Sequence, residues 1–511
     1  MSRRFLLLSL VFLASCAVNE KVPPSLPHPE LKQQAAEAAV LLKKGSYVSL
    51  KQAVQTYSRL YARPEFRKET APKLAIAALL LAVREKELGM SNKSYLDTAL
   101  EVIRQNRPLA GLVPYAEIAG FLWVQGKGVI AEVDDRFATK ETEEKLRAME
   151  PELREKAKVD EFSAYMYATL RCLLASPSES VTEPEELAAR FPDSPMLQYK
   201  KATCPQENEE WLSAILGRDP QFYEAAYQLG MIALSRGNLL QAEGYFLKMH
   251  EGIPESSQAT ILLATIAFAL EEVERSLDLY EQTLAIVPDY RDALLGQAIC
   301  LSTLGRSEEA IAACGKIIGL GYWLLGESYY WKAWNQHELK DDVSAEASIE
   351  QSKGRLPTST EVFTLSGLIA MERGDSAKAE KDFLEAVRYN PANSQALFNL
   401  GALYARSENW PDSGLYFEKA GFAFENESQS LQEKITQVLY SSLVQERKDR
   451  LLQKRKSQLD RTLLSRATAF YNAAAGYFNA GQKFKALEMA TRSAEHAAFK
   501  EKAEALSSGI K

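Results

Sequence analysis

Small and bulky apolar residues recur along the second half of this chain with a regular period. Prolines at positions 220, 254, 288, 357 and 391 are separated by 34, 34, 69 and 34 residues. A period of 34 residues fits one helix–turn–helix unit stacked on the next. Each proline ends one unit and begins the next, because it lacks an N–H group and fixes φ. The pattern therefore predicts an all-α solenoid of helical hairpins.

The residues inside the period agree with this prediction. If Tyr223 is position 1, position 15 is glycine at Gly237, Gly305 and Gly374, which suits the turn between two helices. Positions 8 and 20 are small in every unit, as expected where the helices of a hairpin approach closely: Gly230/Ala242, Ala264/Ser276, Ala298/Ala310, Ala333/Ala345, Gly367/Ala379 and Gly401/Ser413. Position 24 is bulky in most units, with Cys314 the exception: Phe246, Tyr280, Ile349, Phe383 and Phe417.

Small residues at positions 8 and 20, a bulky residue at 24 and proline at 32 resemble the tetratricopeptide repeat. The resemblance implies a right-handed superhelical solenoid. Six units are expected over 223–427, and a further unit with Tyr477, Gly481 and Ala486 over 467–511. Residues 31–222 keep the helical composition but lose the period, so we expect divergent helical hairpins there.

The N-terminus has the form of a targeting segment. Arg3 and Arg4 precede a short apolar run, which is too short to span a bilayer. The run ends in Leu-Ala-Ser-Cys, which resembles a bacterial lipobox and implies cleavage of residues 1–15 and lipidation of Cys16. An ordinary signal peptide with an incidental cysteine is the alternative. By analogy with lipoprotein sorting, Ala17 favours the outer membrane, facing the periplasm, and the proline-rich residues 16–30 form a tether.

The charge of the chain limits which partners it can bind, and the positions of its cysteines bear on disulfide formation. The net charge of −7 becomes about −9 without the two arginines of the signal, which argues against nucleic acid. Residues 428–466 are expected to form a charged helical spacer. Their basic part, 441–466, is either solvated or a docking strip for an acidic partner or lipid. Export permits disulfides, but Cys300 and Cys314 occupy core positions of their units. The disulfide state of Cys172, Cys204, Cys300 and Cys314 stays open.

Sequence motifs of catalysis are missing. His337 and Glu338 are not followed by the second histidine of a zinc protease, and the chain has no P-loop, no Gly-x-Ser-x-Gly and no Cys-x-x-Cys. We therefore expect no enzyme activity, no cofactor and no metal.

In tetratricopeptide proteins the first helix of each unit lines a concave groove through positions 2, 5, 9 and 12. Most of these positions are apolar or aromatic here, which departs from the carboxylate-clamp type and suits an amphipathic helix or apolar peptide. The alternative is that the N-terminal half, or the helix near 430–466, folds back and fills the groove. The residues expected to line it are Tyr227, Met231, Ile261, Phe268, Leu295, Ile299, Tyr330, Trp334, His337, Leu368, Met371 and Phe398.

These features predict a membrane-anchored repeat lipoprotein that acts as a scaffold or adaptor for other proteins or peptides in a bacterial cell-envelope complex. The lipidated Cys16 would attach it to the membrane. The alternative function is a transporter accessory that binds an apolar small molecule in a closed cavity lined by Tyr330 and Trp334.

Overall fold

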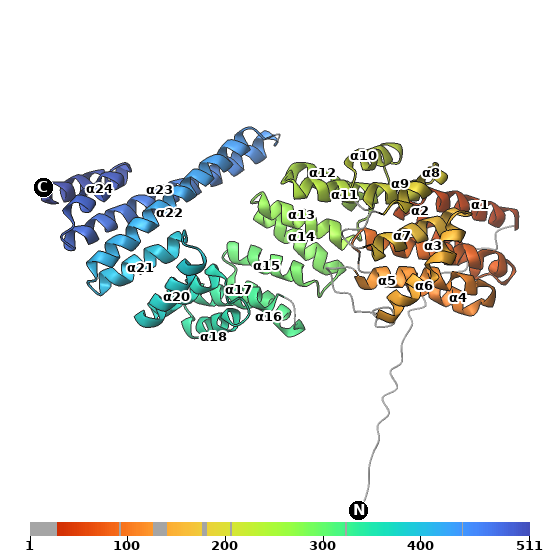
Figure 1. The fold of residues 1–511 in the computed structure, drawn as a ribbon, viewed down its shortest axis with the longest axis horizontal. Coiled ribbons are helices and arrows are strands. Elements are labelled where there is room, and N and C mark those ends of the chain that lie inside the picture. Colours follow the sequence, from red (N-terminus) through yellow and green to blue (C-terminus); the bar gives the residue numbers. More distant parts are fainter. Residues whose placement is uncertain are drawn as a thin grey trace, which may run out of the picture. The chain divides into compact units, whose positions relative to one another are not determined.

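The computed structural model describes residues 28–90, 94–125, 140–175, 181–204, 207–321, 324–441 and 443–510. These residues form α-helices and two short 3-10 helices, with no β-strand among them, which confirms the all-α prediction (Figure 1). None of the helices in these ranges has the length and apolar character needed to cross a bilayer. The predicted signal peptide, Cys16 and most of the tether lie outside the described residues.

The chain divides into two compact units. Unit 1 lies within residues 1–84, 93–122 and 139–205, and unit 2 within 85–92, 123–138 and 206–511. The helices that begin in unit 1 are α1 (His28–Lys44), α2 (Tyr47–Tyr61), α3 (Pro64–Glu87), α4 (Ser94–Gln105), η1 (Arg107–Leu112), α5 (Val113–Gln125), α6 (Lys140–Ala157), α7 (Glu161–Leu174), α8 (Glu183–Arg190) and α9 (Pro195–Thr203).

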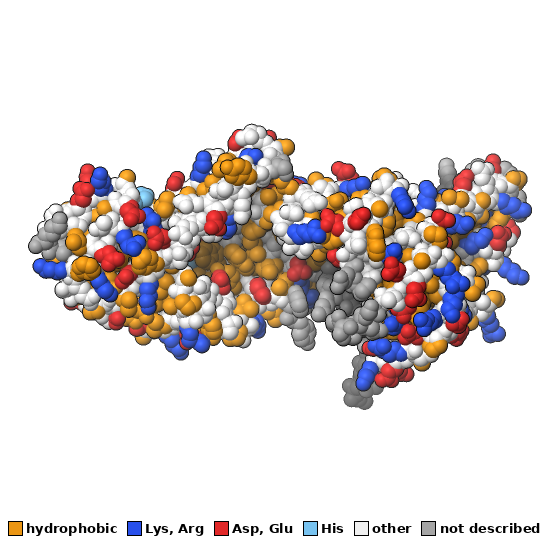
Figure 2. Space-filling view, turned by 45° about the horizontal axis from the view of Figure 1, so that its top comes forward, with side chains coloured by type: hydrophobic (Ala, Val, Ile, Leu, Met, Phe, Trp, Pro, Cys, Tyr) orange, Lys and Arg blue, Asp and Glu red, His pale blue; other side chains and the backbone are white. Residues whose placement is uncertain are grey.

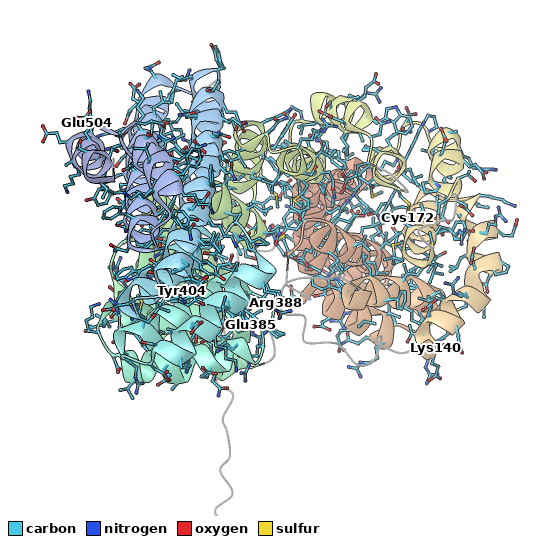
Figure 3. The ribbon with its side chains drawn as sticks, turned by 60° about the vertical axis from the view of Figure 1, so that its left-hand side comes forward. Lys140, Cys172, Glu385, Arg388, Tyr404 and Glu504 are labelled. Carbon is cyan, nitrogen blue, oxygen red and sulfur yellow. A yellow bond between two sulfur atoms is a disulfide. The ribbon has the colours of Figure 1, made fainter. Side chains whose placement is uncertain are left out.

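Unit 1 is held by its apolar core and by one covalent link. The apolar stretch of α3 from Leu74 to Val83 is almost wholly buried. The guanidinium of Arg84 lies 5.1 Å from the ring centroid of Tyr165 and 4.7 Å from that of Tyr199. A disulfide joins Cys172 of α7 to Cys204 at the end of α9, with the two Cα atoms 6.1 Å apart (Figure 3). The sequence had left this pairing open.

Unit 2 contains the regular repeats. Its helices are α10 (Glu209–Arg218), α11 (Tyr223–Ser235), α12 (Leu239–Gly252), α13 (Ser257–Ala269), α14 (Val273–Ile286), α15 (Arg291–Thr303), α16 (Ser307–Leu320), α17 (Leu325–Glu338), α18 (Asp342–Lys353), α19 (Thr360–Glu372), α20 (Ser376–Tyr389), α21 (Ser394–Arg406), α22 (Trp410–Leu439), α23 (Gln445–Asn479), α24 (Lys483–Ser493), η2 (Ala497–Phe499) and α25 (Lys500–Ile510). Helices α11–α21 and the start of α22 form the six predicted hairpins, which we number repeats 1 to 6.

The small residues at positions 8 and 20 lie against each other, as predicted. Ser276 donates a hydrogen bond of 2.8 Å to the backbone carbonyl of Ala264, and Ser413 donates one of 3.0 Å to that of Gly401. Such short bonds between the two helices of a hairpin require that neither position carry a large side chain.

Position 8 also makes room for the ring at position 24. A Cβ atom added to Gly367 would lie 2.6 Å from the ring of Phe383. The same relation joins Gly230 to Phe246 and Gly401 to Phe417. In these repeats the aromatic ring fills the volume that a side chain at position 8 would occupy, so the two positions are coupled by size.

The turn between the two helices of a repeat requires a left-handed residue at position 15. Gly237, Gly305 and Gly374 adopt φ values of 74°, 74° and 82° there. In the intervening repeats the same conformation is adopted by Glu271, Lys340 and Glu408, with φ values from 59° to 63°. A side chain in this conformation is strained by roughly 1–2 kcal/mol.

The chain after repeat 6 differs from the expected short helix and spacer. Helix α22 continues without a break through position 427, where the sequence suggested the end of a repeat, and α23 runs back along it as a long helical hairpin. The hairpin is packed very closely, because a Cβ atom on Gly476 would lie 2.8 Å from the backbone nitrogen of Gly414. Gly421 of α22 similarly faces the ring of Phe470 in α23.

Candidate partner-binding surface

The first helix of each repeat carries the twelve residues predicted to line a groove. Two of them, Ile261 and His337, are buried, with exposed fractions of 7% and 8%. The other ten are half-buried. A half-buried apolar side chain is held in place by the fold, while part of its surface stays exposed to solvent. Such a side chain can contact a second molecule.

Tyr330 and Trp334 lie one helical turn apart in α17. Both are half-buried and pack against an apolar core shared by repeats 4 and 5, which includes Ile349 of α18 and Leu365 of α19. Burial raises the pKa of the Tyr330 phenol to about 12. The phenol is therefore neutral at physiological pH, and the pair offers an amphipathic aromatic surface of the type that dominates many binding interfaces.

The predicted residues at the two ends of the row are in contact with position 24. The ring centroids of Tyr227 and Phe246 are 6.2 Å apart in repeat 1, and those of Phe398 and Phe417 are 5.1 Å apart in repeat 6. In these two repeats the second helix therefore contacts a predicted row residue of the first helix.

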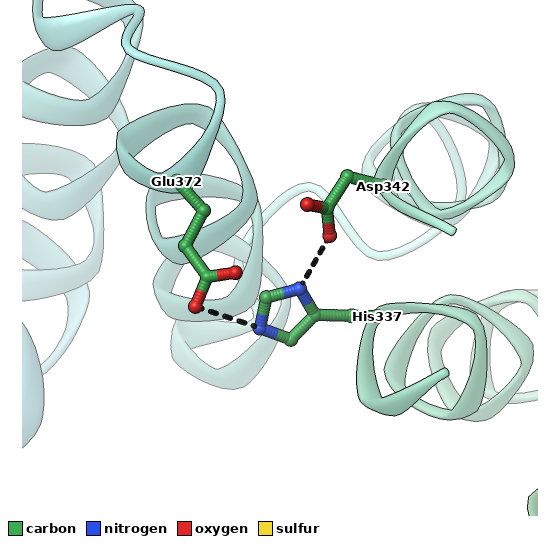
Figure 4. A group of neighbouring side chains, drawn as sticks. All are labelled: His337, Asp342 and Glu372. Atoms are coloured by element: carbon green, nitrogen blue, oxygen red, sulfur yellow. Dashed lines mark hydrogen bonds and ion pairs between the residues drawn. The ribbon is translucent and has the colours of Figure 1, made fainter. Parts of the chain in front are cut away.

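His337 is placed differently from the other predicted residues. Its Nδ1 atom lies 2.8 Å from a carboxylate oxygen of Asp342, and its Nε2 atom lies 3.7 Å from one of Glu372 (Figure 4). The three residues belong to α17, α18 and α19, so the cluster connects repeat 4 to repeat 5. The two carboxylates face different nitrogens of the ring, and the ligand atoms of the three residues lie within 4.8 Å of one another, close enough for a metal ion to be held between them.

The basic segment around 445–455 folds back onto the first repeats of unit 2, where it pairs with glutamates near the turns between helices. That the helix near 430–466 fills the groove of first helices stays a prediction. Val438, Leu443 and Leu451 join an apolar cluster that extends over repeats 1 to 3 and also contains Ile261 and Phe268. The hairpin α22–α23 therefore runs from repeat 6 back to the first two repeats. Figure 2 shows hydrophobic side chains gathered in a hollow beneath the tip of this hairpin.

The sequence did not identify the acidic residues that receive this segment, Glu243, Glu271 and Glu272. One signal was available, since Glu271 occupies position 15, where alternate repeats have glycine. A glutamate in a left-handed turn conformation indicates that something other than the turn selects it. Lys340 and Glu408 at the same position make this a weak signal by itself.

Comparisons with known proteins agree with the repeat assignment. The family model described as the tetratricopeptide repeat matches residues 261–320 and 364–426. The human protein O-mannosyl-transferase TMTC1 is 23% identical over 203 residues, which cover 38% of this chain. Human tetratricopeptide repeat protein 6 is 24% identical over 206 residues, or 33% of this chain. The chain spans only 22% and 40% of the lengths of these two proteins.

Two solved repeat proteins are similar to parts of this chain. A tetratricopeptide repeat protein from Parabacteroides merdae is 17% identical, with a TM-score of 0.37, and the match covers 54% of this chain and 98% of that one. YrrB, titled as a repeat protein with an unusual peptide-binding site, is 21% identical with a TM-score of 0.30 over 37% of this chain and 97% of its own. The family model identifies tetratricopeptide repeats within the two matched segments of unit 2. Such repeats generally bind other proteins or peptides.

Proposed function

We propose that this protein is a lipid-anchored adaptor of the bacterial cell envelope, and that the row of first helices in unit 2 binds a segment of a partner protein. The observation that carries the proposal is the row itself. Ten apolar or aromatic side chains at equivalent repeat positions are half-buried rather than buried, so each keeps an open apolar face.

The chemistry of the row specifies the kind of segment. Aromatic and aliphatic side chains at positions 5, 9 and 12 bind apolar groups and offer no cluster of cations for a carboxylate. An amphipathic helix presents apolar residues at i, i+3, i+4 and i+7, and it would lay this face along the row. Tyr330 and Trp334 stand in the middle of the row and are expected to contribute most of the binding free energy.

The proposed location rests on two features. The Leu-Ala-Ser-Cys sequence ending at Cys16 supports cleavage and lipid attachment. The disulfide between Cys172 and Cys204 supports export, because disulfides persist in oxidising compartments and are rare in the cytosol. An adaptor attached in this way would collect partners at the periplasmic surface of the membrane.

The groove is tested by changing Tyr330 and Trp334 to alanine together. Partners recovered from detergent-solubilised membranes with the full chain are identified by mass spectrometry, and we expect the double variant to recover less than a tenth of them. Phe484→Ala is the matched control, because Phe484 is 83% exposed on α24 and lies outside the row. It should recover partners as the wild type does.

Tyr330 and Trp334 also pack on the core, so the double variant is expected to be less stable. Leu295→Glu, which places a charge at a half-buried position of the row in α15, provides a second variant. Undiminished recovery by both variants, each folded by circular dichroism, would exclude the row as the partner site. Loss of a co-purifying small molecule instead of a protein would favour the transporter accessory.

Lipid attachment is tested by Cys16→Ala. We expect this variant to lose labelling by an alkyne-bearing fatty acid and to leave the membrane fraction or accumulate as the uncut precursor. Cys300→Ala, at a buried free thiol of repeat 3, should be labelled as the wild type is. Equal labelling of Cys16→Ala and the wild type would reject the anchor while leaving the groove untouched.

A further inference from the structure

The tip of the hairpin α22–α23 is held on the first two repeats by ion pairs between residues far apart in the sequence. Nη1 of Arg447 lies 2.7 Å from Oε2 of Glu243, 204 residues away. Nη2 of the same arginine lies 2.7 Å from Oε2 of Glu272, 175 residues away. One guanidinium therefore joins α12 to the beginning of α14.

The receiving surface has a defined chemistry. We call it the acidic cradle, and it consists of Glu243, Glu271 and Glu272 around Leu270. The side chains of the three glutamates are only 7%, 13% and 13% exposed, and Leu270 is 8% exposed. Burial opposes ionisation of Glu243, but hydrogen bonds from Arg447 and Arg275 outweigh it and lower the pKa of this carboxyl. The cradle is thus a negatively charged recess with an apolar floor.

Helix α23 presents the complementary face. Arg447, Leu451 and Arg455 follow one another at intervals of four residues and so lie on one side of the helix. Leu451 is 5% exposed within the apolar cluster. Arg455 and Lys454 pair with Glu271 at 3.1 and 3.2 Å. The bound element is a basic amphipathic helix with a leucine between two cationic groups.

The cradle is not filled by this helix. A cavity of about 670 Å³ is lined by Leu247, Glu274 and the three glutamates on the side of the repeats, and by Arg447, Arg450 and Lys454 on the side of α23. A second cavity of about 550 Å³ is lined by polar residues, among them Lys434 and Arg455, and by apolar side chains of the repeats and of the hairpin: Leu239, Leu240, Leu270, Val438, Leu443 and Leu451. Leu270 and Leu451 border both cavities, so open volume adjoins the apolar contact on either side of the docked face.

We propose that the acidic cradle is a docking site for basic amphipathic helices, and that residues 445–459 of α23 occupy it in cis as a strap that a partner helix of the same chemistry displaces. Partly buried ion pairs return little net free energy after desolvation, so the strap is held reversibly. The unfilled volume leaves apolar and acidic surface for a competitor with longer side chains. This site is separate from Tyr330 and Trp334, and it can be present whether or not the row of first helices binds a partner.

The test measures binding of a fluorescent synthetic peptide of residues 445–459 to the full chain. The wild type should bind it weakly, because the strap occupies the cradle in most molecules. Arg447→Glu with Arg455→Glu repels the strap and should bind the peptide at least about tenfold more tightly, since apparent affinity rises with the fraction of molecules that are competent. An affinity equal to that of the wild type would overturn the proposal.

The cradle itself is tested in the variant that carries Arg447→Glu and Arg455→Glu, because the strap is repelled there. Glu271→Gly removes one of the three carboxylates and also relieves the left-handed strain of position 15, and it should abolish at least half of the gain in affinity. Glu408→Gly relieves the same strain in repeat 6 and is the matched control, so it should keep the gain. If both glycine variants bind alike, the peptide is not in the cradle.

A distance measurement tests, without the peptide, whether the strap contacts the acidic cradle of its own chain. Spin labels on cysteines introduced at Val444 and Glu274, two exposed residues that line the same cavity, should give one narrow distance distribution in the wild type. Arg447→Glu with Arg455→Glu should broaden it and lengthen its mean. A narrow distribution retained in that variant would show that the strap does not open, and would reject the proposal.

Discussion

In both the regular repeats and the long hairpin of unit 2, an aromatic ring fills the space above a glycine. The two parts differ in how far apart the ring and the glycine lie in the sequence. In repeat 5 the ring of Phe383 occupies the space above Gly367, and both residues belong to one hairpin of α19 and α20. In the hairpin α22–α23, the ring of Phe470 occupies the space above Gly421 in the same way. The hairpin also makes contacts that reach across several repeats, among them those of Arg447.

The comparison shows what each kind of contact can specify. A repeat is determined by residues within 34 positions, and it contacts mainly the next repeat. The docking of the hairpin tip depends on where six successive repeats place Glu243 and Glu272 relative to the end of the row. Small changes in the curvature of the row of repeats would move Glu243 and Glu272 away from Arg447. Docking of the hairpin tip therefore depends on the shape of unit 2.

The largest expected effect is in the regular repeats. Phe383→Ala removes a fully buried ring and leaves a cavity above Gly367, which should lower the free energy of unfolding by about 3–5 kcal/mol. Urea denaturation followed by circular dichroism measures the change. Phe484→Ala removes the same group from an exposed site and should change stability by less than about 0.5 kcal/mol. Similar losses in the two variants would mean that the ring at position 24 does not hold the repeat together.

The next effect is in the hairpin. Gly476→Ala places a methyl group against the backbone of Gly414 and should cost about 1–3 kcal/mol by forcing α22 and α23 apart. Gly509→Ala, at an open helical position of α25, should instead be neutral or stabilising by up to about 1 kcal/mol. Thermal unfolding midpoints show whether each variant is less or more stable than the wild type. A stabilising Gly476→Ala would contradict the close approach of the two helices.

The smallest effect is that of pH on the docked tip. Burial opposes ionisation of Glu243 and Glu272, but hydrogen bonds from Arg447 and Arg275 lower both pKa values below the ordinary 4.5. A lowered folded-state pKa gives stability that is present above 4.5 and is lost as pH falls through the folded-state value. Arg447→Gln should therefore cost about 1 kcal/mol at pH 7, after screening by solvent, and progressively less below pH 4.5.

The control for this effect is the exposed pair Glu385 and Arg388 on α20 (Figure 3). Arg388→Gln removes a pair that solvent already screens, so it should change stability less than Arg447→Gln does at pH 7. Urea denaturation of both variants at pH 7 and at pH 3.5 gives the comparison. A cost of Arg447→Gln that stays constant with pH would show that the tip is not held by ionised carboxylates.

Most of the repeat structure could be predicted from the sequence. The small residues at positions 8 and 20, the ring at position 24 and the turn glycines all stand at fixed spacings, because each makes its contacts within one hairpin. Cys300 and Cys314 were expected in the core on the same basis, and both are buried free cysteines. The predicted row of first-helix residues also follows from the register, and the structure places ten of the twelve with one face open.

The sequence by itself thus determined the all-α class and the repeat register, since contacts within one hairpin recur at a fixed spacing; the binding role of the row stays a prediction. Only the tertiary structure decided that Cys172 pairs with Cys204, that α22 and α23 form one long hairpin, and that Arg447 docks on Glu243 and Glu272. The physical reason is distance along the chain. Contacts between residues 175 or 204 positions apart depend on the summed geometry of all the helices between them, and no spacing in the sequence records that sum.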